Sequence, residues 1–162
     1  MSDETKQIAR ILDQMAHEVL DQLKDLSGEE LNRPLTLPET NTLFALATHL
    51  VGAGEFWVLV IAGGRIIPRD RLAEFQASGS LADLTARYDS WITGVHEVLN
   101  ALAPERMEER IDVNHYRSAP LAAPWEVSVR EALFHAIEHT ALHLGHIQLT
   151  RQLLGYSPPS EE

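Results

Sequence analysis

The chain has no cysteine among its 162 residues. Disulfide bonds, cysteine-bound zinc and a thiol nucleophile supplied by the protein are therefore excluded. Basic residues are also few, 13 against 24 acidic residues, and the formal net charge is −11. Binding to nucleic acid or to anionic lipid depends on lysine and arginine side chains that neutralise phosphate groups, so this balance argues against both partners.

No segment has the composition of a targeting or membrane-spanning sequence. Residues 1–6 are polar and acidic, without the apolar core or the cleavage site of a signal peptide. The longest apolar run, residues 43–63, contains His49, Glu55 and three glycines. These interruptions favour a buried helix of a soluble bundle over a membrane span. With no cysteine and no signal sequence, we expect a cytoplasmic protein.

Apolar residues at steps of three and four predict four amphipathic helices. The predicted helices cover residues 3–26, 42–62, 81–102 and 128–154. Thr40 or Asn41 is expected to cap the second helix, and glycines end the second and fourth, at Gly63-Gly64 and Gly155. No stretch alternates with period two for long enough to predict a strand.

Four amphipathic helices predict an all-α fold, and a four-helix bundle is the simplest way to bury their apolar sides. The connections at residues 63–80 and 103–127 are long enough for crossovers. Because crossovers leave neighbouring helices parallel, we predict an up-down-down-up order. Residues 1–156 would form a single helical domain, followed by a short C-terminal tail at residues 157–162.

Histidines are concentrated in the last predicted helix, where residues 135–146 contain four and the mean frequency of the chain predicts roughly 0.6. They are His135, His139, His143 and His146. At about 100° per residue, all four lie within about 80° of helix surface. Leu142, Leu149 and Leu153 lie on the same side, so we expect it to point at least partly into the bundle. Buried imidazoles need partners, because an unsatisfied polar group costs about 1–3 kcal/mol.

His139 and His143 are one helical turn apart, close enough to bind a single metal ion. His49 lies within the apolar stripe of the second predicted helix, where a histidine is more often a satisfied core residue than a ligand. It is about 12 Å from the start of its helix, and His143 is about 16 Å from the end of its own. Antiparallel packing would bring all three to one depth. Three protein ligands leave coordination positions open, as in catalytic zinc sites.

The order of these motifs resembles that of the DinB/YfiT-like family of four-helix metalloproteins. The residues on which this resemblance rests are His49, the stretch HTALHLGHI at residues 139–147 and the ending GYSPP at residues 155–159. The family commonly has a late His-x-x-x-His, an Arg-Gly-Gln-Ile-like continuation and a Gly-x-x-Pro-Pro ending. Leu144 and His146 depart from the family pattern, which often has arginine and glutamine at these positions.

The resemblance implies that His49, His139 and His143 bind one divalent ion, with zinc and nickel ahead of iron. Some members are similar to transferases and isomerases that use a low-molecular-weight thiol. We therefore expect a metal-dependent enzyme that acts on a small molecule by hydrolysis or thiol-dependent transfer. His135 and His146 flank the pair and are the candidate catalytic residues, as proton carriers or as hydrogen-bond partners of the ligands.

Two other functions stay open. The stretch HAIEH at residues 135–139 matches the zinc-peptidase signature His-x-x-Glu-His, in which Glu138 would be the general base and His135 and His139 the ligands. Alternatively, the bundle is a non-catalytic module for metal binding or protein interaction. The apolar sides of the first and third helices could also support a homodimer, because sequence does not separate a core from an interface.

Three residues of the predicted connections are candidates for lining a substrate pocket, although anchoring of the loops is the commoner role for such side chains. They are Arg65, Tyr116 and Trp125. The remaining histidines have no spacing that suggests a common ligand set, and we expect them at the surface or at helix caps. These are His17, His96 and His115.

Overall fold

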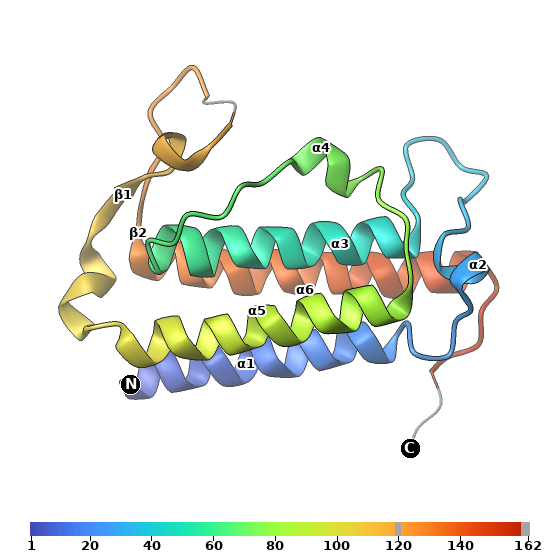
Figure 1. Ribbon diagram of the computed structural model, residues 1–162, viewed down its shortest axis with the longest axis horizontal. Coiled ribbons are helices and arrows are strands. Elements are labelled where there is room, and N and C mark those ends of the chain that lie inside the picture. Colours follow the sequence, from blue (N-terminus) through green and yellow to red (C-terminus); the bar gives the residue numbers. More distant parts are fainter. Residues whose placement is uncertain (119–120, 160–162) are drawn as a thin grey trace.

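Four long helical stretches form the body of the protein (Figure 1). The computed structural model describes residues 1–118 and 121–159. The stretches are α1 (Asp3–Asp21), α3 (Leu43–Gly54) continued by η1 (Glu55–Ala62), α5 (Leu81–Ala101) and α6 (Val129–Leu153). The prediction of a mostly helical fold is confirmed.

Capping side chains mark where the long helices begin. Ser128 caps α6, as its sequence suggested, by accepting the backbone N–H of Glu131. The side chain of Thr42 caps α3, so the expectation of Thr40 or Asn41 in this role is wrong by one or two residues. The predicted first helix over residues 3–26 is also too long, because α1 ends at Asp21 and turns follow it. Just after this end, the carbonyl of Gln22 accepts a hydrogen bond from the guanidinium of Arg151.

The four stretches enclose a common core. α1 packs against α5 and α6, and α3 packs against the same two helices. In Figure 1 the chain runs from left to right along α1 and α6 and from right to left along α3 and α5. Tyr88, Trp91, Leu12 and Leu50 lie between them and are at most 1% exposed. The antiparallel pair α3 and α6 carries the histidines singled out above.

The second helical stretch changes its winding halfway along. η1 is a π-helix that continues α3 without a break, and the N–H of Gly63 donates to the carbonyl of Val58, five residues earlier, at 2.9 Å. Residues 56–62 are all buried. A 3.6-residue period does not distinguish this winding from an α-helix, so the sequence predicted one uniform helix. Gly64 ends the element with a φ of 70°, which a glycine adopts without strain.

The stretch Leu43–Ala62 is long and apolar enough to cross a membrane. In this structure, however, 94% of its most apolar window is buried inside the protein. Burial of this extent agrees with the sequence-based expectation of a core helix in a soluble bundle.

The connections between the long helices carry short elements. α2 (Gly28–Leu31) follows α1, and the segment at residues 63–80 passes along α3 and carries α4 (Arg71–Glu74) (Figure 1). Between α5 and α6 lie η2 (Pro104–Glu108), β1 (Arg110–Asp112), η3 (Val113–Tyr116) and β2 (Glu126–Ser128).

β1 and β2 form a small antiparallel ribbon at one end of the bundle. Ile111 lies opposite Val127, and both side chains pack on the core. The expectation that the chain forms no strand is therefore wrong at this place. Each strand has only three residues, which is too short for a period-two pattern to be visible in the sequence.

Candidate metal centre

The histidines of α6 lie at the border between its buried and its exposed sides. Leu133, Ala136 and Ile147 face the core. The leucines that were expected to point into the bundle are exposed, namely Leu142, Leu149 and Leu153. That expectation is wrong because α6 has apolar residues on two sides, and periodicity alone does not say which side packs against α1 and α3.

His49 of α3 meets His139 and His143 of α6 between the two helices. The ring centroids are 5.1 Å apart for His49 and His139, 4.8 Å for His49 and His143, and 4.4 Å for His139 and His143. One ring nitrogen from each lies within 4.8 Å of the others. Ligands of a tetrahedral zinc ion are about 3.4 Å apart, so small side-chain rotations would bring all three onto one ion.

A buried carboxylate fixes the orientation of His49. The Nδ1 atom of His49, whose side chain is almost fully buried, lies 2.8 Å from Oε2 of Glu74 on α4. Because the carboxylate accepts, Nδ1 carries the proton and Nε2 is free to act as a ligand. Phe75 stacks on the imidazole ring, with its ring centroid 4.3 Å from that of His49.

Glu74 is itself held from two sides. Arg69 donates its Nε and a terminal nitrogen to the two carboxylate oxygens, at 2.7 and 2.9 Å. Burial raises the pKa of Glu74, but the hydrogen bonds from His49 and Arg69 outweigh burial and leave this pKa below its usual value. The carboxylate is therefore ionised at neutral pH and accepts the proton of the imidazole N–H.

Gly52 makes room for this carboxylate on the surface of α3. A Cβ atom at Gly52 would collide with Oε1 of Glu74 and would also press on a terminal nitrogen of Arg87. Sequence reasoning missed Glu74 because it lies in a connection, at no recognisable spacing from the histidines. A glycine one helical turn after His49 was the one available sign that another group approaches α3 closely.

His139 and His143 are neutral at ordinary pH. Burial, reinforced by the imidazoles around it, lowers the pKa of His139 to about 3. Burial and the neighbouring His49 lower the pKa of His143 to about 4. Nδ1 of His139 is buried and has no hydrogen-bond partner among the described residues. A metal ion would satisfy such a nitrogen, so the three histidines fit a divalent ion in protonation state and in unmet bonding capacity.

These pKa values predict that the metal-free chain loses stability as the pH falls from about 7 to 5. In the unfolded chain a histidine titrates near 6.5, so it takes up a proton in this window while the folded chain keeps His139 and His143 neutral. The urea midpoint should therefore fall with pH. A variant with glutamine in place of both histidines should lose much of that slope, and a wild-type midpoint that is flat or rises would contradict the assignment.

The two candidate catalytic histidines lie beside the triad and outside it. The ring of His135 is 4.4 Å from that of Trp57 and 5.9 Å from that of His139. His146 is exposed, with its Nδ1 atom 3.4 Å from Nδ1 of His143. Both side chains are thus close enough to the triad to contact a molecule bound there.

The other predicted site residues occupy different places. Glu138 of the zinc-peptidase signature is 79% exposed at its side chain and lies 3.6 Å from His135. Trp125 packs edge-on against Trp57, while Arg65 pairs with Glu97 at 2.7 Å. Tyr116 lines a surface cavity between η1 and α4.

Comparisons with known proteins agree with this fold. A conserved protein from Enterococcus faecalis superimposes with a TM-score of 0.72 at 15% identity, covering 95% of this chain and 98% of that one. A DinB-like protein from Bacillus subtilis gives 0.67 at 18% identity, covering 96% of each chain. At these identities the likeness shows the fold, and the resemblance to DinB-like proteins is confirmed. No curated protein matches the chain.

The family is shown by the sequence itself. The family model described as mycothiol-S-transferase matches residues 7–155, which include all three histidines of the cluster. We conclude that the chain belongs to the mycothiol-S-transferase family.

Proposed function

We propose that this protein is a metal-dependent thiol S-transferase in which His49, His139 and His143 hold one divalent ion. The observation that carries the proposal is the convergence of these imidazoles from α3 and α6, with a buried nitrogen of His139 that has no partner among the described residues. Three ligands leave room for a substrate, whereas a structural zinc ion normally has four protein ligands. Imidazole ligands suit zinc, nickel and iron alike, and the ion that we propose is zinc or nickel, with iron as the alternative.

The chain supplies the ligands and their orientation but not the sulfur. It has no cysteine, so the thiol must come from a small cosubstrate. When bound, a divalent ion lowers the pKa of a coordinated thiol, which makes the thiol a nucleophile at neutral pH. Glu74 keeps the proton of His49 on Nδ1, and the low pKa values of His139 and His143 keep both rings unprotonated.

We assign the handling of protons to His146 and His135. His146 is exposed next to His143 and can exchange protons with solvent. His135, beside Trp57, faces the same region from the preceding turns of α6. Hydrolysis of a small substrate is the second reaction that this arrangement could perform, with a water in place of the thiol.

The zinc-peptidase alternative receives no support from the geometry. His135 lies outside the cluster formed by His49, His139 and His143, and Glu138 points its carboxylate into solvent. A non-catalytic metal-binding module has the same ligands, so only turnover separates it from an enzyme.

The test combines metal analysis with an assay of thiol consumption. We expect about one equivalent of zinc or nickel per chain. Conjugation of mycothiol to a small electrophile should stop on chelation and return when the ion is added back. Less than about a tenth of an equivalent, not restored by added zinc or nickel, would overturn the metal site. A loaded protein that turns over no thiol and no ester in a broad panel would be the non-catalytic module.

A further inference from the structure

The outer side of α6 is apolar, unlike the outer sides of the other long helices. Four large apolar side chains of α6 are each slightly more than half exposed, namely Phe134, Leu142, Leu149 and Leu153. The structure describes α1, α3 and α5 along their whole length, and none of them exposes a large apolar side chain. The apolar sides of α1 and α5, considered above as a dimer surface, lie in the core. A row of exposed apolar side chains on one helix marks a contact surface for another molecule.

The same side of α6 carries few charges. From Ala141 to Leu153, none of its exposed residues is a lysine, arginine, aspartate or glutamate. The chain as a whole has a net charge of −11, so two copies that approach through acidic surfaces repel each other. A surface without charge can meet its own copy without this repulsion. The charge distribution therefore favours α6 as the place where two copies of the chain come together.

The residues along this side of α6 have the spacing of a helix–helix contact. Positions 138, 142, 145, 149 and 152 follow one another at steps of four and three, the repeat with which two helices pack along a common side. At about 100° per residue, all five lie within about 80° of helix surface. All five are exposed, and we call them the α6 seam: Glu138, Leu142, Gly145, Leu149 and Gln152.

The α6 seam is complementary to itself when it is reversed. In an antiparallel pair that crosses at Gly145, Leu142 of each copy meets Leu149 of the other. Glu138 then lies opposite Gln152, whose amide can donate to the carboxylate. Gly145 lies opposite its own counterpart, where the absence of a Cβ atom lets the two helices approach closely. A parallel pair would instead place the two Glu138 carboxylates against each other, so the seam favours a second copy in the antiparallel direction.

We propose that two copies of this protein associate through the α6 seam, as an antiparallel pair with its twofold axis at Gly145. Phe134 and Leu153 extend the apolar contact beyond the two ends of the seam. Residues 134–153 form a helix segment about 30 Å long, and one pair of such segments is at the lower end of specific interfaces in size. The dimer therefore forms at micromolar rather than nanomolar concentrations.

This pairing leaves the three-histidine site accessible. His146 follows Gly145 directly, so it is turned by about 100° around α6 from the centre of the seam. His139 and His143 are turned further, towards His49 of α3, with which they form the cluster. Dimer formation and metal binding are therefore separate properties, and the inference does not rest on the proposed S-transferase activity.

Sedimentation velocity of the full-length chain tests the association. We expect mostly monomer at about 1 µM and mostly dimer at about 200 µM. Leu149→Glu should raise the Kd at least about 100-fold, because it places an unpaired carboxylate against Leu142 of the other copy, twice in each dimer. Ile66→Glu is the matched control, since Ile66 is 94% exposed and lies outside α6. It makes the same change of charge and should leave the Kd within about threefold.

A cysteine introduced on α6 tests the direction of the pair, because the chain has no cysteine of its own. With oxidised glutathione as the oxidant, Gly145→Cys should form a disulfide between the two copies, since the Cα atoms at the crossing come within the range of about 4.4–6.8 Å that a disulfide spans. Ala141→Cys is the control. In the antiparallel pair, position 141 lies about 12 Å along the helix from its counterpart, so it should form little disulfide.

The outcomes that would overturn the proposal differ from one another. A chain that stays monomeric at about 200 µM has no such dimer, and α6 would then be covered by a different protein. An unchanged Kd in Leu149→Glu would place the contact elsewhere. Equal cross-linking of Ala141→Cys and Gly145→Cys would exclude the antiparallel seam. All three substituted residues are exposed, and far-UV circular dichroism checks that each variant is folded.

Discussion

His143→Ala is expected to lower the affinity of the chain for zinc or nickel by more than about 100-fold. Loss of a group that only supports a ligand already costs about 10–100-fold in metal affinity, and loss of a ligand should cost more. His143 lies with its ring 4.4 Å from His139 and 4.8 Å from His49, so its removal takes away one of the three imidazoles that converge on the site. Competition with a chromophoric chelator measures the change.

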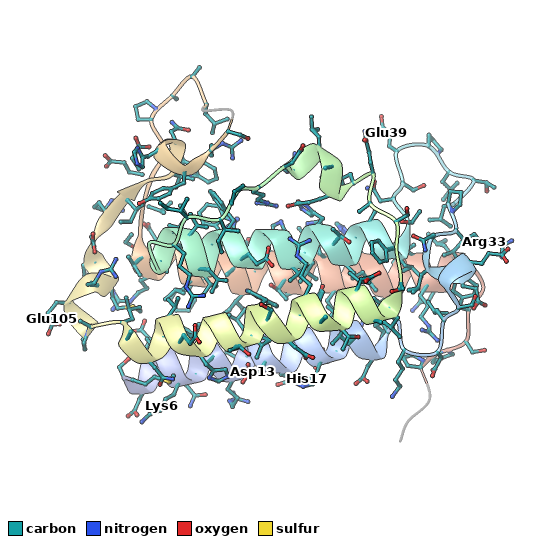
Figure 2. All side chains as sticks on the ribbon, viewed as in Figure 1. Lys6, Asp13, His17, Arg33, Glu39 and Glu105 are labelled. Carbon is teal, nitrogen blue, oxygen red and sulfur yellow. The ribbon has the colours of Figure 1, made fainter. Side chains whose placement is uncertain are left out.

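Two histidine variants serve as controls for this result. His17→Ala should leave metal affinity unchanged, because His17 lies on the outer side of α1 and bonds to the carbonyl of Asp13 in its own helix (Figure 2). His135→Ala should also retain the metal. If His135→Ala released the ion and His143→Ala kept it, the zinc-peptidase assignment of the ligands would be correct and the triad wrong.

Glu74→Gln is expected to weaken metal binding by about 10–100-fold without removing any ligand. The amide keeps the size of the side chain but loses the negative charge that Arg69 and His49 share. His49 would then be held less firmly with Nε2 towards the ion. The cobalt-loaded protein gives a second measurement, because its visible spectrum reports the geometry of the ligands.

Gly52→Ala tests the same arrangement from the other side. The added Cβ atom would collide with Oε1 of Glu74 and displace the carboxylate from His49, so metal affinity should fall by a similar factor. Gly145→Ala is the matched control. A Cβ atom there meets nothing within 4 Å, and the substitution should leave metal binding unchanged while stabilising α6 by about 0.5–1 kcal/mol.

If Glu74→Gln and Gly52→Ala both bind metal as tightly as the wild type, Glu74 has no positioning role. A fall in the affinity of Gly52→Ala alone, together with a lower thermal midpoint of the metal-free chain, would indicate general damage to α3. Metal affinity and metal-free stability are therefore measured on every variant.

The sequence predicted the helices and the pairing of His139 with His143 because both depend on local periodicity. His139 and His143 share a helix, and their spacing alone places them one turn apart. The approach of His49 required only that α3 and α6 pack side by side and run in opposite directions. The sequence also predicted that Ser128 caps α6 and that Gly155 ends it, since both effects act within one helical turn.

The rest of the site could not be predicted, because it depends on where the connections fold back. Glu74 and Phe75 lie 25 and 26 positions after His49, in a segment without periodicity. The exposed side of α6 was misassigned because leucines such as Leu142 resemble core residues in a sequence pattern. The π-helical winding of η1 arises from packing and has no composition of its own.

The position of α4 over His49 also determines how an ion would enter and leave. α4 has four residues, three of them exposed, and short elements of this kind open at a lower free-energy cost than the bundle as a whole. Glu74 would move away from His49 in such an opening while the core between the long helices stays packed. We therefore expect the lifetime of this one helical turn to set the residence time of a bound ion, on a timescale separate from that of global unfolding.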